Sequence, residues 1–130
     1  MPTTTTWLTL DSGTSPKGLF YTTVTIADGA SLSGAINLHN MTLVSLQIPA
    51  SWTSAKISFA ASLDDTTFGS LLTPTGEIAS TAALADGNVL ALDPSAFFGQ
   101  QYLKVRSGTA AAATNQTGAK IIRVVARSMQ

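Results

Sequence analysis

Apolar and polar residues alternate with a period of two through most of the readable segments of this chain. The alternation is clearest in five segments, which are rich in the Val, Ile and Thr residues that favour strands. These segments are residues 20–26, 42–48, 56–61, 102–106 and 120–127. Fainter alternation predicts weaker strands at residues 7–10, 32–38, 68–72 and 89–92. The pattern therefore predicts a chain built from short strands.

The alternation also assigns one set of side chains in each strong strand to the core and the other set to solvent. The predicted inward positions are Phe20, Val24 and Ile26; Val44, Leu46 and Ile48; Ile57, Phe59 and Ala61; Leu103 and Val105; and Ile122, Val124 and Ala126. The predicted outward positions include Leu43, Lys56 and Ser58, together with Lys104, Arg106, Arg123 and Arg127.

Helix is scarce in this pattern. Residues 50–54, after Pro49, and residues 94–98 read as short helical turns. In the second turn Asp93 is the predicted cap and Pro94 takes the first helical position. There is no room for the series of longer helices that an alternating β/α fold needs. The sequence thus predicts an all-β, antiparallel two-sheet β-sandwich, for which the jelly roll is one arrangement, with one or two short helical turns.

Two segments lack the pattern of core strands. Residues 1–6 contain four consecutive Thr. We therefore expect a flexible N-terminal arm that orders only against a neighbour, followed by a single domain over residues 7–130. Residues 107–118 are long for a hairpin loop. They contain Ala110, Ala111, Ala112 and Ala113. Four small apolar side chains suit close contact with another subunit, and the alternative is a floppy exposed loop.

Composition narrows the function more than the fold. The chain has 130 residues, seven Lys and Arg against seven Asp and Glu, and no Cys. This balance lacks the basic field of non-specific nucleic-acid binding, and no thiolate or disulfide framework is available. The first residues do not resemble a signal peptide, and no window approaches the length of a membrane helix. We expect no nucleic-acid partner, no membrane partner and synthesis in a cytoplasm.

The charges are segregated along the chain, since every acid precedes the five C-terminal cations. Lys104 and Arg106 point outward from one predicted strand, and Arg123 and Arg127 point outward from the last. If these two strands are neighbours, the four cations form one basic patch on a neutral protein. We hypothesise that such a patch docks an acidic surface of a partner subunit. The alternative is four solvated side chains that protect a sheet edge from aggregation.

Candidate chemistry is sparse. His39 is the only histidine and no G-x-S-x-G motif is present, so little supports a Ser-His-Asp hydrolase. Asp64 and Asp65 lack the spacing of a calcium loop, and an Asp pair caps a turn without an ion. A sugar-stacking platform would need Trp7, Trp52, Tyr21 and Tyr102, yet an aromatic in a turn more often plugs a core. We therefore expect no catalytic residue, no metal, no cofactor and no enzymatic activity.

Two longer runs carry a resemblance. Residues 48–68 (IPASWTSAKISFAASLDDTTF) resemble a "PAxWT-A-x-(I/L)-x-F-x-x-S-x-DG-x-x-F" run in small proteins encoded among the virion genes of tailed bacteriophages. Residues 103–109 (LKVRSGT), followed by Asn115 and Gln116, resemble the "LKVRSGT…NQ" run of the same family. The last strand also fits, so the resemblance covers residues 40–130. One departure is Asp65, where that family usually has Gly, so this turn must avoid a positive φ or accept strain.

The resemblance implies a bacteriophage virion structural protein with a β-sandwich fold. Within that class it favours a capsid decoration or cement protein on the capsid surface, which stabilises the head through protein–protein contacts. The implied partners are the major capsid protein or other virion subunits, and analogy with decoration proteins favours a homotrimer. Two alternatives stay open: a tail or head–tail connector component, and a carbohydrate-binding module of a host-recognition structure.

Overall fold

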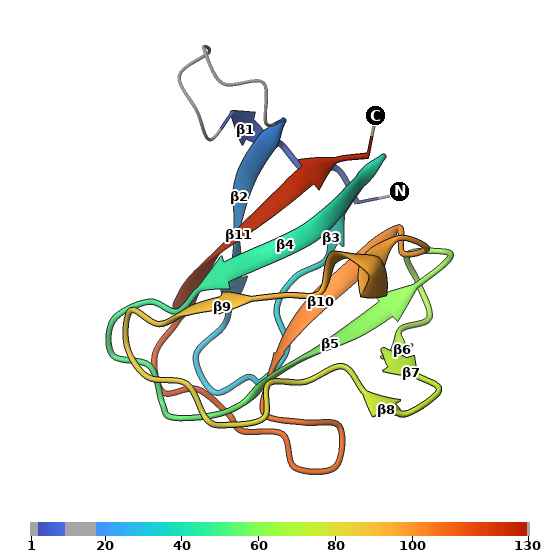
Figure 1. Cartoon of the computed structure of the whole chain (residues 1–130). Coiled ribbons are helices and arrows are strands. Elements are labelled where there is room, and N and C mark those ends of the chain that lie inside the picture. Colours follow the sequence, from blue (N-terminus) through green and yellow to red (C-terminus); the bar gives the residue numbers. More distant parts are fainter. Residues whose placement is uncertain (1–2, 10–17, 130) are drawn as a thin grey trace.

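The structure, a computed structural model, describes residues 3–9 and 18–129 as two antiparallel sheets that pack face to face (Figure 1). The five-stranded sheet has the order β1 (Leu8–Thr9), β2 (Leu19–Ile26), β11 (Lys120–Ser128), β4 (Met41–Gln47), β9 (Val89–Ala91). The four-stranded sheet has the order β3 (Ile36–Asn37), β10 (Tyr102–Ser107), β5 (Ile57–Ser62), β6 (Gly69–Ser70). A small hairpin pairs β7 (Leu72–Thr73) with β8 (Gly76–Glu77). The predicted all-β sandwich is confirmed.

The strand order is that of a jelly roll. Apart from β1 and the small hairpin, eight strands make up the two sheets, in the chain order β2, β3, β4, β5, β6, β9, β10, β11. The five-stranded sheet contains the first, eighth, third and sixth of these in order, and the other sheet contains the second, seventh, fourth and fifth. This is the eight-stranded double-sheet arrangement of two Greek keys. One consequence is that strands close in sequence, such as β10 and β11, lie in different layers.

The core lies between the two sheets and is made by the side chains that the alternation assigns inward. On β2 and β11, which pair from Leu19↔Arg127 to Lys120↔Ile26, the inward Val24 and Ile122 face each other and are buried. On β10, Leu103 and Val105 are fully buried. Each such side chain removed from water contributes roughly 1.5–3 kcal/mol. The predicted inward faces of these three strands are confirmed.

On β4 the predicted alternation is wrong at one point. Leu43, expected to face outward, is fully buried, and Val44, expected inward, is half-buried. A bulge explains the change, because Ser45 pairs with Val125 while Leu43 pairs with Ala126. Val44 is therefore an extra residue without a partner on β11, and the faces reverse on either side of it. From Leu46 onward the predicted faces hold.

On β5 the outward side is covered as well as the inward side. Ser58, predicted to face solvent, is fully buried. Its hydroxyl donates to the Gly108 carbonyl at 2.7 Å, and its backbone bridges to Ala79. Later segments of the chain thus lie over a strand whose local pattern predicts exposure. Lys56, just before the strand, is exposed as expected.

One of the two predicted helical turns forms. Residues Pro94–Phe97 make a 3₁₀ helix, η1, and the Asp93 carboxylate caps it by accepting from the Ser95 amide at 3.1 Å. Residues 50–54 are not helical. Ser51 has φ 60°, and the Asp86 carboxylate accepts from the Ser51 amide at 2.9 Å and from the Trp52 amide at 2.8 Å. This contact with a distant carboxylate holds the segment in a tight non-helical turn.

The weaker predicted strands form as short pieces. Residues 32–38 give an isolated bridge at Leu32 and then β3, residues 68–72 give β6 and the start of β7, and residues 89–92 give β9. Residues 7–10 give β1, except that Leu10 lies outside the described residues.

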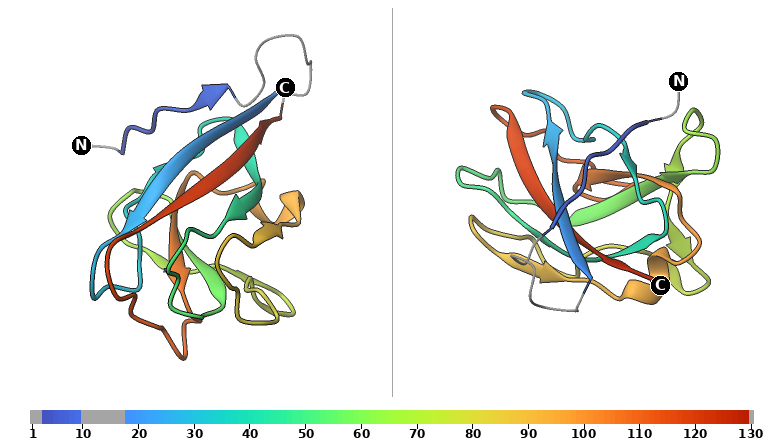
Figure 2. Two further views of the ribbon diagram at one scale, coloured as in Figure 1. Left: turned by 90° about the vertical axis from the view of Figure 1, so that its left-hand side faces the viewer. Right: turned by 90° about the horizontal axis from the view of Figure 1, so that it is seen from above.

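Residues 3–7 lie against their own domain. In the right-hand view of Figure 2 this segment crosses the side of the molecule that faces the viewer. The Thr3 hydroxyl donates to Asp65 at 2.8 Å, and the Thr5 hydroxyl accepts from the Asn37 amide at 2.8 Å. The expectation that this segment orders only against a neighbour is therefore corrected for Thr3 and Thr5. Residues 1–2 of the expected arm lie outside the described residues.

Candidate functional site

The four cations predicted to form one patch lie on two different sheets. Lys104 and Arg106 belong to β10 in the four-stranded sheet, whereas Arg123 and Arg127 belong to β11 in the five-stranded sheet (Figure 1). The single basic patch is therefore wrong, because β11 inserts between β2 and β4 and never pairs with β10. The role of these residues in binding a partner stays a prediction, and it must be considered for each face separately.

On the four-stranded sheet both cations have partners within the chain. The Lys104 ammonium lies 4.5 Å from the centre of the Phe68 ring. One guanidinium nitrogen of Arg106, Nη1, lies 3.1 Å from Glu77 Oε2 and also donates to the Ser58 hydroxyl at 3.2 Å. The Arg106 and Glu77 side chains are 12% and 21% exposed. On this face the charge of Arg106 is therefore balanced by Glu77, whereas Lys104 keeps its charge and is held against a neutral ring.

Glu77 also contacts the loop of residues 107–118, which we call the alanine-rich loop. Its Oε2 accepts from the Ala110 amide at 2.9 Å. Within the loop Thr109 and Ala112 exchange two backbone hydrogen bonds of 3.2 Å, so the tip closes as a tight turn. Ala110, Ala111, Ala112 and Ala113 are all exposed. The loop therefore presents four small apolar side chains from a hydrogen-bonded turn, and its contact with another subunit stays a prediction.

The base of this loop requires glycine. Gly108 has φ 92°, a conformation that L side chains rarely adopt. A Cβ atom added there would lie 2.5 Å from the Ala112 carbonyl oxygen and 2.6 Å from the Thr114 nitrogen. The close return of the loop onto β10 is thus possible only without a side chain.

Gln116 joins the two runs that carry the sequence resemblance. Its side chain is buried, and its Oε1 accepts from the Thr53 amide at 2.8 Å. Its Nε2 donates to the Thr53 carbonyl at 2.9 Å and to the Ser107 hydroxyl at 2.7 Å. Nothing in the local alternation singles out Gln116. Its place at the end of the "LKVRSGT…NQ" run is the one signal that points to it, and Glu77 had no such signal.

The outer face of the five-stranded sheet differs from that of the four-stranded sheet in carrying arginines that form no ion pair with a described residue. We call it the arginine face and define it by the outward side chains of β2, β11 and β4. These are Tyr21, Thr23, Thr25, Ile121, Arg123, Val125, Arg127, Ser45 and Gln47. The Arg123 guanidinium lies 5.1 Å from the centre of the Tyr21 ring, and Ile121 is 59% exposed. A shallow hollow of about 400 Å³ lies beside Thr23, Gln47, Ile121 and Arg123.

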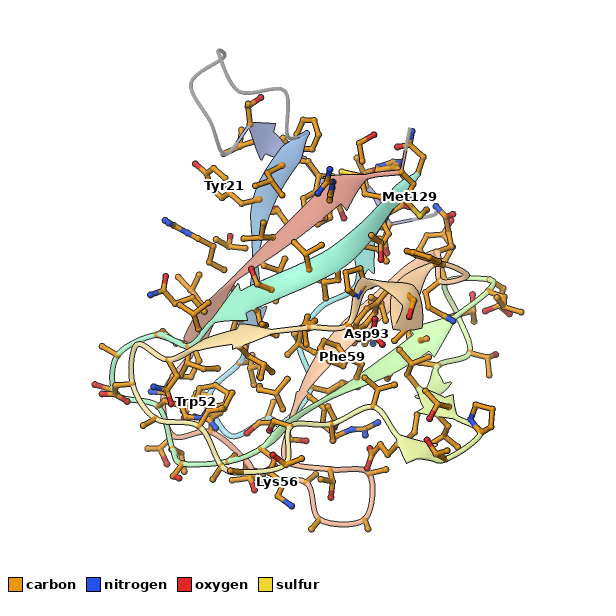
Figure 3. All side chains as sticks on the ribbon, viewed as in Figure 1. Tyr21, Trp52, Lys56, Phe59, Asp93 and Met129 are labelled. Carbon is orange, nitrogen blue, oxygen red and sulfur yellow. The ribbon has the colours of Figure 1, made fainter. Side chains whose placement is uncertain are left out.

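A second hollow, of about 410 Å³, lies where η1 and β9 approach the hairpin of β7 and β8. Its floor is Phe59 and Phe97, whose rings meet edge to face with centres 5.1 Å apart; Figure 3 labels Phe59 and Asp93 here. The two acids in its lining, Glu77 and Asp93, are already engaged with Arg106 and Ser95. Its described lining therefore offers apolar surface and no unengaged carboxylate.

Asp64 caps its turn as expected, whereas the Asp65 carboxylate accepts from Thr3 and not from a turn amide. The pKa of Asp64 is lowered to about 2 by the hydrogen bonds that its carboxylate accepts from the Thr67 and Thr66 amides and the Ser62 hydroxyl. Asp65 has φ 63°, a positive value that glycine adopts more readily than other residues, and its carboxylate accepts hydrogen bonds from Thr3. Along residues 3–9 and 18–129 no group of three or more His, Asp or Glu side chains is arranged to hold a metal ion.

The remaining candidates are His39 and the two tryptophans. His39 is exposed at a turn with φ 56°. Trp52 is 7% exposed and fills the lower left end of the core in Figure 3. Trp7 is half-buried, and its indole nitrogen donates to the Asn37 carbonyl at 3.0 Å. The exposed coplanar platform that a sugar site would need is therefore not formed by Trp52 with Trp7.

The strand order and core define the molecule as a jelly-roll β-sandwich. Comparison with known protein families gives no match, and comparison with curated proteins gives none either. Among solved structures, the chain is similar to the SPBc2 prophage-derived protein YomS, with a TM-score of 0.52 and 16% identity. The match covers 85% of this chain and 95% of that chain, so the two share one fold over nearly a whole domain. In the part that the structure describes, no helix is long and apolar enough to cross a membrane.

Proposed function

We propose that this chain is a structural protein of a bacteriophage particle, and more narrowly a decoration or cement protein on the capsid surface. The observation that carries the proposal is the fold match to a prophage-derived protein over 95% of that protein's chain. Fold alone does not specify function, so the proposal also draws on the surfaces described above and on the sequence resemblance.

The resemblance gains support from where its residues lie. Residues 48–68 contain the turn held by Asp86, all of β5 and the turn capped by Asp64. Residues 103–116 contain most of β10, the alanine-rich loop and Gln116. The Gln116 side chain bonds to Thr53, so these two runs form one hydrogen-bonded unit. Residues of such a unit are expected to be retained together in proteins that share this packing.

The proposed chemistry is association and not catalysis. The chain offers an exposed turn of four alanines and the arginine face, both of which are outward surfaces on a rigid sandwich. We propose the major capsid protein, or another virion subunit, as the partner, and a homotrimer as the assembled form. Jelly rolls serve both in viral capsids and in lectins, so the sugar-binding alternative deserves a direct test. The burial of Trp52 weighs against it.

The test is the location and copy number of the protein in purified particles of the phage or prophage that encodes it. A decoration protein is expected in proportion to the major capsid protein, with deletion of its gene making heads less stable to heat or chelation. A small fixed number of copies at a ring-shaped vertex or tail structure would instead identify a connector or tail component. A monomer that is absent from particles and retained on a glycan column would contradict the proposal.

A further inference from the structure

We propose that the arginine face binds an acidic surface on a different protein of the particle. The inference deepens the proposed function and rests on it, because it names the surface and the chemistry of the contact. It replaces the four-cation patch, which the fold does not form, with one face of the five-stranded sheet.

The first argument is that the two arginines of this face are exposed and form no ion pair with a described residue. Arg123 and Arg127 both project from β11 on the same side, since they are an even number of residues apart on one strand. Both are exposed, and neither forms an ion pair with a described residue, whereas Arg106 on the other sheet is paired with Glu77. No outward position of β2, β11 or β4 on this face is acidic. The face is therefore locally positive on a protein of zero net charge.

The second argument concerns the acids of the same chain. Each acid among the described residues already accepts hydrogen bonds at a turn or within the ion pair. Their partners are Gly118 for Asp28; Ser62, Thr66 and Thr67 for Asp64; Thr3 for Asp65; Arg106 and Ala110 for Glu77; Ser51 and Trp52 for Asp86; and Ser95 for Asp93. Asp64 and Asp65 share one turn, but their carboxylates, like those of the other described acids, are already engaged within the chain, so a second copy has few free carboxylates to offer.

Symmetry gives the third argument. If two copies met through this face about a two-fold axis, the arginines of one would meet the same surface of the other. Like charges brought together at an interface oppose binding. A two-fold contact of this face with itself is therefore disfavoured. Since the described acids are already engaged within the chain, the partner that fits this face is a different, acidic protein, and the proposed homotrimer would form through other surfaces.

The composition of the face favours a protein over a nucleic acid. Exposed Ile121 and half-buried Tyr21 and Val125 interleave with the two arginines, and Arg and Tyr are enriched at protein interfaces. The contact of Arg123 with the Tyr21 ring restricts the guanidinium before binding, which lowers the entropy cost of association. Two unpaired cations are too few for the phosphate contacts that sustain nucleic-acid affinity.

The test compares two variants of equal charge. Arg123→Gln with Arg127→Gln removes both cations of the arginine face, and Lys56→Glu subtracts the same charge at a distant exposed position. Figure 3 shows Lys56 at the opposite end of the molecule from Tyr21. Each variant loses two units of formal charge and so has a net charge of −2, and circular dichroism checks that each is folded. Each variant is added to phage particles that were produced without the gene for this protein. The copies bound per particle are then counted at low and high salt.

We expect the wild type and the Lys56→Glu variant to bind alike, and the Arg123/Arg127 variant to bind at least about tenfold more weakly. Wild-type binding should fall as salt is raised. If the wild type binds particles and the Arg123/Arg127 variant binds equally well, the inference is overturned while the proposed function stands. If the Arg123/Arg127 change instead dissolves a wild-type oligomer in light scattering, the occupant is a second copy and the inference is also overturned.

If the wild type is absent from particles and does not bind them, the proposed function fails and a separate measurement decides the inference. Fluorescence anisotropy with poly-L-glutamate then supplies an acidic polypeptide probe, with duplex DNA and anionic phosphatidylserine vesicles as competitors. Binding of poly-L-glutamate that is lost only in the Arg123/Arg127 variant supports the face as an acidic-protein site. Absence of that binding, or a stronger dependence on the same arginines for DNA or vesicles, overturns it.

Discussion

At the scale of single residues, carboxylates set the turns of this molecule. Asp64 closes the turn after β5, Asp86 holds the turn before Trp52, and Asp93 caps η1. The amides that they satisfy have no sheet partner, so each carboxylate replaces a backbone acceptor. The hydrogen bonds from Ser51 and Trp52 likewise lower the pKa of Asp86. The chain thus uses most of its few acids to hold its own backbone.

The variant Asp64→Asn tests whether the ionised carboxylate of Asp64 stabilises its turn. The pKa of Asp64 is about 2 in the folded protein, below its ordinary value of 3.8, so the ionised carboxylate favours folding. That contribution is fully present above about pH 4 and is lost as pH falls towards 2. We expect the variant to melt at a lower temperature than the wild type near neutral pH, with the difference shrinking below about pH 4. A melting-temperature difference that stays constant across this range would contradict the assignment.

At the scale of elements, Glu77 couples three segments. It joins β8 to β10 through Arg106 and to the alanine-rich loop through the Ala110 amide. The loop is therefore presented at a set position relative to the four-stranded sheet. A contact surface that is already ordered loses less entropy when a partner binds. This coupling is the physical reason to regard the four alanines as a preformed surface.

Glu77→Ala is expected to release the loop. The variant loses a partly buried ion pair and one amide hydrogen bond, which we expect to cost about 1–2 kcal/mol of the free energy of unfolding. Hydrogen exchange at the Ala110 amide should become faster, as measured by mass spectrometry of the peptide that spans it. Glu77→Gln is the control, because its side-chain oxygen can still accept from Ala110 and should restore most of the protection. Unchanged exchange in Glu77→Ala would show that the loop is held by other contacts.

At the scale of the whole molecule, Phe97 links the elements that close one side of the sandwich. It comes from η1, which follows β9 of the five-stranded sheet, and its ring meets Phe59 of the four-stranded sheet at an angle of 81°. Both side chains are essentially inaccessible to solvent. Loss of this contact should therefore destabilise both sheets together, because they share one core.

Phe97→Ala and its neighbour Phe98→Ala form a matched pair. Phe97 is fully buried and Phe98 is 57% exposed. We expect Phe97→Ala to reduce the free energy of unfolding by about 3–5 kcal/mol, and Phe98→Ala to change it by no more than about 0.5 kcal/mol. Urea denaturation followed by tryptophan fluorescence measures both, and each should remain a single transition. Equal losses of the free energy of unfolding in the two variants would contradict the assignment of the buried contact to Phe97.

Local chemistry was sufficient to predict much of this protein from its sequence. The period-two pattern located the strands at residues 20–26, 102–106 and 120–127, because side chains on a strand alternate between faces whatever the partner strand is. The cap at Asp93 followed from the same kind of local reasoning. The two longer runs pointed to Gln116 only by resemblance.

Tertiary structure alone decided which surfaces exist. It placed β10 and β11 in different sheets, inserted the bulge at Val44 and buried Ser58 under the Gly108 segment. It also separated the paired Arg106 from Arg123 and Arg127 on the arginine face. Local alternation cannot specify these outcomes, because they depend on which distant strands pair and on the side chains those strands bring into contact.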